Sequence, residues 1–373
     1  MARAKGVQSR ADFKAATDAH APRTGPATAK AEAQARDTGK LNPLVDPSGF
    51  GVIRRSLIRF EKRDDGLWVV AVGTPVPIEM RVDTTSSMGN ELDNALKSLP
   101  DTFELMARML PGCDPQMSIG IFGDVCDRFA LCRPQFEMEA RKIVEQITLQ
   151  VPCRGGGDIP EDPDLGLFGG AYLTATYLEL IGLKGYDITI SDAPGRGMVD
   201  EKELIRVYGP EVFDKVTENG HQINRRDMPN TKDIVTYLQR RAHAFFFQVN
   251  GSSETASFWA SIYGRNRVVK LPSTSLLPQV TATVIGLTEG TLKLREVEAY
   301  LMSNNVDART ADLIVSSVAN IPIGAQAALP NFGKRPQKGD LFRNKTDLWP
   351  IDPNEVPKAA SPEAKGKGGK RWL

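Results

Sequence analysis

The sequence predicts an α/β protein with a doubly wound, mostly parallel sheet that carries one antiparallel edge strand, together with a small helical C-terminal appendage and flexible termini. Short apolar segments alternate with longer helical segments through the middle of the chain, and this alternation is typical of a parallel sheet covered on both faces. One neighbouring pair of apolar segments is joined by a turn too short for a crossover, so those two strands are predicted to be antiparallel.

The predicted strands are short, apolar and rich in β-branched or aromatic residues. In chain order they cover Val76–Asp83, Met117–Phe122, Arg128–Arg133, Tyr186–Ser191, Ala244–Val249 and Arg267–Leu271. The turn GDVCD joins the second and third of these and makes the antiparallel pair. Upstream, Gly51–Gly73 predicts a β-hairpin around the charged turn EKRDDG.

The predicted helices carry apolar residues at helical spacing. They cover Glu91–Leu110, Met138–Ile147, Leu165–Leu180, Lys232–Arg241, Ala256–Gly264 and Ser275–Leu287. After Gly290, the spacing of Val297 and Leu301, and then of Ala311 and Val315, predicts an appendage of two or three helices.

These elements divide the chain into five parts. The parts are a flexible basic arm (1–47), a leading β-hairpin (48–75), the main α/β domain (76–290), a helical appendage (291–329) and a flexible basic tail (330–373). Both arms are polar and lack a sustained apolar period, which predicts disorder. Trp349 and Trp372 stand in the polar tail and leave open that it docks on a partner.

The overall composition favours a cytoplasmic protein. The 47 Lys and Arg residues balance 46 Asp and Glu residues, so net charge gives no reason to expect nucleic acid or a membrane as partner, although the tail KGKGGKR leaves weak phosphate binding open. No secretion signal is apparent, and no stretch approaches the ~20 apolar residues needed to span a bilayer. The four cysteines have no CxxC spacing, which predicts reduced packing residues.

The first segment that carries chemistry is the loop after the strand that ends at Asp83. Asp83, Thr85 and Ser87 stand at alternate positions where the chain turns from strand to helix, so a tight loop can aim all three oxygens at one point. Carboxylate and hydroxyl oxygens suit a hard cation such as Mg²⁺ or Mn²⁺. The same residue types also cap helices, and that alternative stays open for this loop taken alone.

Two further loops carry acids. In GGGDIPED, which begins at Gly155, three glycines permit unusual backbone paths, and Asp158 and Glu161 add carboxylates. A phosphate loop is not expected there because the GK[ST] ending is missing and the acids would repel phosphate. Asp192 directly follows the strand Tyr186–Ser191. Because the carboxyl ends of parallel strands meet at one edge of a sheet, the three loops together predict a metal site.

The order of these segments resembles the von Willebrand factor type A (vWA) domain. The spacing Asp83-x-Thr85-x-Ser87 is similar to the DxSxS metal-ion-dependent adhesion motif (MIDAS) of that family, with threonine in the middle place, and GGGDIPED and SDAPGRG follow in the family's order. The forms DTTSSMG and GGGDxPE look most like intracellular bacterial and alpha-kinase-associated members. The resemblance covers about residues 76–290.

The resemblance implies one divalent cation, usually Mg²⁺, at the edge of a Rossmann-like sheet. Thr85 and Ser87 would bind it directly, and Asp83 and Asp192 directly or through water. The family usually offers a threonine from the second loop, whereas Asp158 stands in that place here. A second departure is the first strand, where Glu79 and Arg81 interrupt a usually apolar core strand, so one of its faces is expected to be partly exposed or paired with the hairpin.

The resemblance also implies the function. The expected role is a metal-dependent adaptor in which an acidic side chain of another protein completes the metal shell, beside the partner-contacting residues Gly157, Glu161 and Met88. Similar intracellular proteins often work with MoxR-type AAA+ ATPases. Two alternatives stay open: a structural or virion-associated component, and a metal-assisted hydrolase. An enzyme is not the expected class because no histidine stands near the three loops and only Glu161 could act as a base.

Overall fold

The computed structural model describes residues 8–21, 25–49, 51–89, 91–153, 155, 161–250 and 252–356. Its centre is a six-stranded sheet in the order β10-β9-β8-β4-β5-β6. The strands are β4 (Thr74–Asp83), β5 (Cys113–Phe122), β6 (Leu131–Cys132), β8 (Gly185–Ser191), β9 (Ala242–Val249) and β10 (Val268–Leu271). All neighbours pair in parallel except β5 and β6, which are antiparallel. The predicted fold class, including its antiparallel edge strand, is therefore confirmed.

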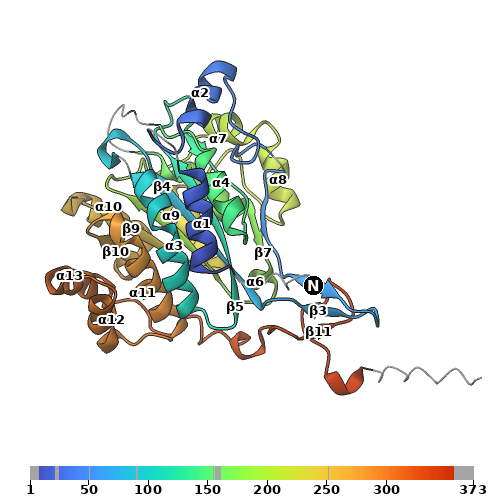
Figure 1. Ribbon diagram of the computed structural model, residues 1–373. Helices are drawn as coiled ribbons and strands as arrows, with labels where there is room; N and C mark the ends of the chain where they lie inside the picture. The colour runs from blue at the N-terminus through green and yellow to red at the C-terminus, as the bar shows by residue number, and fades with distance from the viewer. Residues whose placement is uncertain are drawn as a thin grey trace, which may run out of the picture.

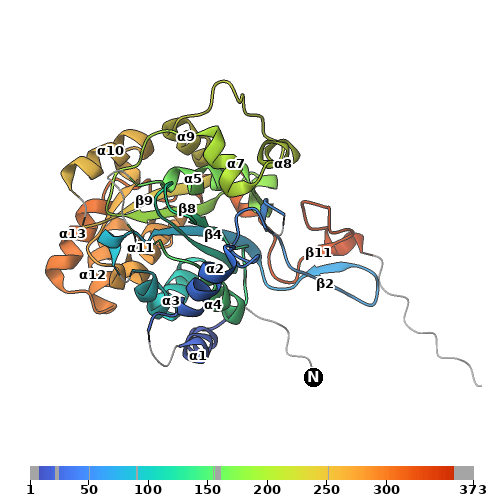
Figure 2. The same cartoon turned by 90° about the horizontal axis from the view of Figure 1, so that it is seen from above.

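Helices cover both faces of this sheet (Figures 1 and 2). One face is packed by α1 (Arg10–His20), α3 (Glu91–Met109), α4 (Ala140–Thr148) and α11 (Leu277–Glu289). The other is packed by α5 (Pro163–Tyr172), α7 (Glu201–Tyr208), α8 (Val212–Glu218), α9 (Thr231–Arg241) and α10 (Ser253–Tyr263). On β9, Phe245 and Phe247 enter the first core and Ala244 and Phe246 the second, as the two-residue period of a strand requires.

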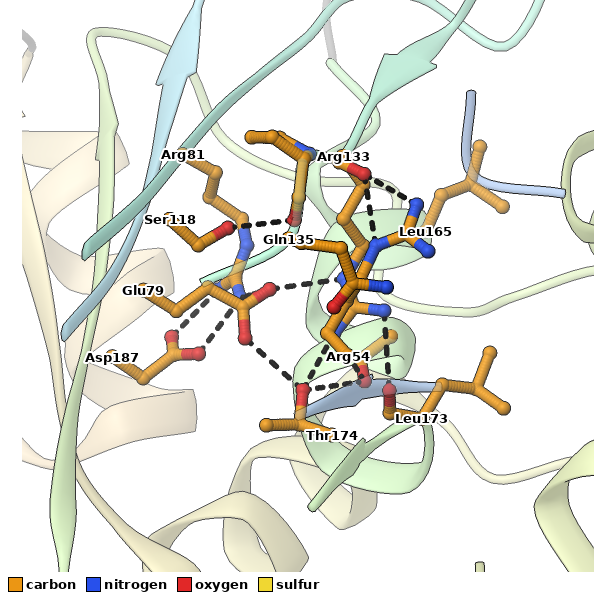
Figure 3. Close-up of polar contacts among 12 residues, drawn as sticks. Arg54, Glu79, Arg81, Ser118, Arg133, Gln135, Leu165, Leu173, Thr174 and Asp187 are labelled. Carbon is orange, nitrogen blue, oxygen red and sulfur yellow. Dashed lines mark hydrogen bonds and ion pairs between the residues drawn. The ribbon is translucent and has the colours of Figure 1, made fainter. Parts of the chain in front are cut away.

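The central strand β4 places two charged side chains in the buried interior. Glu79 and Arg81 are only 5% and 2% exposed, so the expectation that one face of this strand is partly exposed or paired with the hairpin is wrong. Arg81 forms a two-pronged ion pair with Asp187 of β8, with Nη1 2.6 Å from Oδ1 and Nη2 2.7 Å from Oδ2 (Figure 3). Glu79 can be buried because it accepts a 3.0 Å hydrogen bond from Arg133 Nε.

Arg133 and Arg54 extend this pairing into a buried charge network that joins separate parts of the chain (Figure 3). Arg133 donates to the carbonyl oxygens of Gly169 and Leu173 at the end of α5. Arg54 donates in turn to the Arg133 carbonyl oxygen and to the Asp46 carbonyl oxygen. A buried arginine is tolerated when its donors are satisfied in this way. The network therefore fixes the N-terminal segment and α5 against β4.

The helix predicted over Leu165–Leu180 is wrong in its second half. The structure has α5, then the short strand β7 (Thr174–Thr176), then α6 (Tyr177–Leu180). The strand β7 pairs in parallel with β1 (Arg54–Ser56). Thr174 and Thr176 are β-branched and favour strand geometry, and the partner strand lies more than a hundred residues upstream, so helical spacing alone does not reveal the break.

The basic arm 1–47 is not simply flexible, because its described part contains α1 and α2 (Ala29–Thr38). Ser9 caps α1 through a reciprocal capping box with Asp12. Phe13 is fully buried, and its ring stacks on Phe103 of α3 with centroids 4.4 Å apart. Two buried residues per helix are too few to produce the apolar period on which the sequence prediction relied.

The hairpin around EKRDDG is confirmed as β2 (Phe60–Lys62) and β3 (Trp68–Val70). A third strand, β11 (Leu341–Phe342), pairs with β3 in antiparallel fashion. The tail predicted to be flexible is therefore ordered in part, since β11 covers an edge of the hairpin and buries Phe342. These three strands project from the main body (Figure 2).

The helical appendage is confirmed as α12 (Val297–Ser303) and α13 (Ala308–Val318). Val297, Leu301, Ala311 and Ile314 are buried in the first core. None of the helices in the described residues is long and apolar enough to cross a membrane. The four cysteines are free thiols, and Cys113 and Cys132 are buried.

Candidate metal centre

The candidate site lies where the chain changes direction across the sheet. Asp83 is the last residue of β4, and Asp192 follows Ser191, the last residue of β8. The strands β4 and β8 are neighbours at the centre of the sheet. The strand that follows β4 in the chain, β5, lies on one side of this pair, and the strand that follows β8, β9, lies on the other side. In open α/β sheets, ligands bind at this point, outside the carboxyl ends of the strands.

Asp83 is fully buried and its carboxylate is held by hydroxyl and amide donors. Its Oδ1 accepts hydrogen bonds from the Thr85 amide nitrogen at 2.9 Å and from Thr85 Oγ1 at 2.8 Å. Its Oδ2 accepts from Ser191 Oγ at 2.6 Å. The loop thus folds back on the strand end, and the short Thr85 side chain is fixed beside the carboxylate.

Ser87 joins the two strand ends. Its hydroxyl donates to Asp192 Oδ1 at 3.0 Å and lies 3.3 Å from Thr85 Oγ1. Ser87 is exposed, whereas Asp83 and Thr85 are buried. Four of the five predicted metal ligands, from two loops more than a hundred residues apart, therefore form one hydrogen-bonded group that opens to solvent at Ser87.

Glu161 adds a buried acid to this edge. It is 5% exposed, and its Oε2 has no hydrogen-bond partner among the described residues. Its amide nitrogen donates to the Pro194 carbonyl oxygen at 3.0 Å, which ties the second loop to the third. Burial, and then the nearby carboxylates of Asp83 and Asp124, raise the pKa of Glu161 well above its usual range.

The site accumulates negative charge in a poorly solvated place. Burial raises the pKa of Asp83 to about 6, although the hydrogen bonds from Ser191 and Thr85 oppose the shift. Burial also raises the pKa of Asp192, against the hydrogen bond from Ser87. A divalent cation beside these groups would favour their charged forms. The donor set of carboxylates and hydroxyls therefore fits a hard cation.

Carboxylates make up only part of the candidate ligand set. Among the described residues, no group of three or more His, Cys, Asp or Glu side chains is arranged to hold a metal ion. The candidate set among the described residues instead combines two acids, Asp83 and Asp192, with the hydroxyl groups of Thr85 and Ser87. The predicted residues Gly157 and Asp158 lie outside the described residues, although Gly155 is described and its carbonyl oxygen accepts from the Ser86 amide at 2.7 Å.

Met88 is placed differently from the prediction. It is 4% exposed and packs in the first core, so it cannot contact a partner in this conformation. Glu161 is also buried and faces the site rather than solvent. On the loop after β8, Met198 is 69% exposed.

The structure adds residues that the sequence analysis missed. Asp124, in the turn after β5, is fully buried and lies 3.7 Å from Nη2 of Arg196. Arg196 Nε in turn lies 3.0 Å from Asp162, so this one cation joins the second and third loops to the turn after β5. Ser191 orients Asp83. The position of Asp124 just after a strand was a usable signal, whereas the role of Ser191 depends on a side-chain direction that sequence does not specify.

No family model matches the sequence, and no curated protein matches it. Among solved structures, the chain is similar to the pilus adhesin SpaC from Lactobacillus rhamnosus GG in its open conformation, with a TM-score of 0.38 and 11% identity over 61% of this chain and 33% of that chain. It is also similar to proximal thread matrix protein 1 from the mussel byssus, with a TM-score of 0.33 and 12% identity over 58% of this chain and 48% of that chain. The chain thus spans less than half the length of either protein, and at these values neither likeness establishes a shared function.

Proposed function

We propose that this protein is a metal-dependent adaptor that holds a divalent cation, Mg²⁺ or Mn²⁺, and recognises an acidic side chain of a partner protein there. The observation that carries the proposal is the hydrogen-bonded group of Asp83, Thr85, Ser87 and Asp192 at the switch point of the sheet. The proposed ligands are these four residues together with Asp158. The resemblance to the vWA family supports the same assignment.

Burial and chemistry support the choice of a cation. Asp83 and Glu161 are buried acids with raised pKa values, and an uncompensated buried charge is costly. A bound cation would offset that cost. When bound, the ion would supply a positive centre that accepts a further carboxylate oxygen.

The chain's own residues have distinct parts in this proposal. Ser191 and the Thr85 amide hold the Asp83 carboxylate in one orientation. Ser87 is the exposed member of the set and lies on the side from which a partner can approach. Partner capture without turnover is the proposed role, in the cytoplasm, and a MoxR-type AAA+ ATPase is the partner class that the family resemblance suggests.

The test combines metal titration with partner capture. Calorimetric titration of metal-free protein with Mg²⁺ should show one site, and Asp83→Ala should abolish it while Asp312→Ala, at an exposed position on α13, should not. Tagged protein should retain a partner from its native lysate in Mg²⁺ and lose that partner in EDTA. Retention of the same partners by Asp83→Ala and in EDTA would overturn the proposal.

A further inference from the structure

A groove lies away from the candidate metal centre, between α10, α13 and the edge strand β10. Its volume is about 490 Å³, within the usual range of ligand sites. The floor comes from the sheet, and the walls come from the two helices, which both contact β10. Figure 1 shows these three elements side by side at one edge of the sheet. The residues that line the groove are Gln248, Ala256, Ser257, Ala260, Ser261, Arg265, Val268, Lys270, Ser316, Ser317 and Asn320.

The groove is lined by positive charge only. Its charged lining residues are Arg265 and Lys270, and no acid lines it. Both side chains are exposed, and neither forms an ion pair or a side-chain hydrogen bond with any described residue. Unpaired cations that line a groove attract a carboxylate or phosphate group.

The walls distinguish between these two anions. Ser257, Ser261 and Ser317 each donate their hydroxyl hydrogen to a carbonyl oxygen of their own helix, at 2.8, 2.7 and 2.9 Å. The hydroxyl lone pairs that remain can only accept. A peptide offers a series of N–H donors to such acceptors, whereas a free phosphate dianion, HPO4²⁻, offers a single O–H.

The size of the lining side chains also suits a peptide. Ala256 and Ala260 on α10 face the groove together with the serines, and side chains this short let a main chain approach closely. Pairing of a partner strand with β10 is not the expected mode, because α13 packs against the β10 edge. An extended segment would instead lie over the face of β10, along α10.

We propose that this groove binds a short acidic segment of a partner protein, with its carboxylates on Arg265 and Lys270 and its amide groups against the serine hydroxyls. This site is separate from the proposed metal centre and needs no metal. The two sites share α10, whose Thr255 donates to the Asp192 carbonyl oxygen at 3.3 Å, so one partner could engage both.

Fluorescence anisotropy of the full-length protein in EDTA tests the groove alone. The probe is a short fluorescein-labelled peptide that alternates glutamate with serine, and the comparison peptide carries lysine in place of glutamate. The acidic peptide should bind and the basic peptide should not. The double variant Arg265→Glu/Lys270→Glu should weaken binding at least about tenfold, and Ala260→Phe, which fills the groove without a change of charge, should weaken it as well.

The matched control is Lys293→Glu/Arg295→Glu, which makes the same change in net charge at exposed positions outside the groove. It should bind the acidic peptide like the wild type. An equal loss of affinity for the acidic peptide in both double variants would show that only the net charge of the protein matters, and it would overturn the proposal. Displacement of the peptide by inorganic phosphate at equal affinity would make the groove an anion site and overturn it too. Binding that needs Mg²⁺ would assign the peptide to the metal centre instead.

Discussion

Asp83 and Glu79 both belong to β4, and both carboxyl groups are buried, yet their pKa values move in opposite directions. Burial opposes ionisation of Glu79, but Arg133 and Arg81 hold its pKa at about 2. Asp83 is bonded by hydroxyl and amide donors, and burial raises its pKa to about 6. Among the described residues no Lys or Arg forms an ion pair with Asp83. One strand therefore carries a compensated acid within the core and an uncompensated acid at the candidate site.

His243 gives a prediction at the residue scale. Burial lowers its pKa from 6.5 to about 3, although the hydrogen bond with Gln326 opposes the shift. Between these values the unfolded chain binds the extra proton and the folded protein does not. Stability should therefore fall as the pH drops below 6.5, by at most about 1.4 kcal/mol per pH unit from this group.

Urea unfolding of the wild type and His243→Gln at several pH values checks this expectation. The variant should be less stable at neutral pH but should lose less stability on acidification. His20→Gln, at a part-exposed position on α1, should keep the wild-type slope. An unchanged slope in His243→Gln would contradict the assignment.

Arg133 gives a second prediction. Arg133→Met would leave Glu79 buried with only Arg81, 3.4 Å away, and Thr174 as polar partners. Loss of one partner from a buried pair costs about 3–5 kcal/mol, so this variant should be destabilised by that amount in chemical denaturation. Arg55→Met, at a half-exposed position on β1, should cost little. Addition of Glu79→Gln to Arg133→Met should recover part of the loss, and a further loss would show that the two residues act separately.

At the scale of elements, α1 shows how a short helix is held by few contacts. Phe13→Ala removes its buried ring from Phe103 and should cost about 3 kcal/mol at most, because α1 can detach while the sheet stays folded. Hydrogen exchange should then lose protection in α1 and retain it in β4. Lys14→Ala, at an exposed position one residue along, should leave protection unchanged. Simultaneous loss of protection in β4 would mean that α1 is part of the main cooperative unit.

Sequence predicted the elements that carry a strong local period and failed where a distant contact decides the structure. The six strands of the main sheet were found because their apolar runs are self-evident, as in the segment before Asp192. Two strand pairs join residues that are far apart in the chain, namely β1 with β7 and β11 with β3. No local sequence pattern predicts such pairing. At the site, the strand ends located Asp83 and Asp192, whereas the inward position of Met88 follows from helix packing that the spacing does not reveal.

The whole molecule should respond to metal as one unit. Mg²⁺ that binds only the folded protein should stabilise it by about 2.7 kcal/mol at a hundred times its dissociation constant, which thermal unfolding would detect as a rise in Tm. Asp83→Asn should abolish that rise. Without metal the same variant should be at least as stable as the wild type, since it removes a buried acid whose pKa is raised. An equal rise in the variant would place the metal elsewhere.

The pairing of β11 with β3 also links the C-terminal segment to the strand that leads into the centre of the sheet. The strand β3 ends at Val70, and β4 begins at Thr74, whose hydroxyl donates to the Pro336 carbonyl oxygen. From there β4 runs through the centre of the sheet to Asp83, bonded along its length to β5 and β8. Tension between the C-terminal segment and a partner held at the candidate site would act along this strand. Because both points of attachment lie on β4, its covalent backbone would carry that tension, while its hydrogen bonds to both neighbours would keep the strand in the sheet.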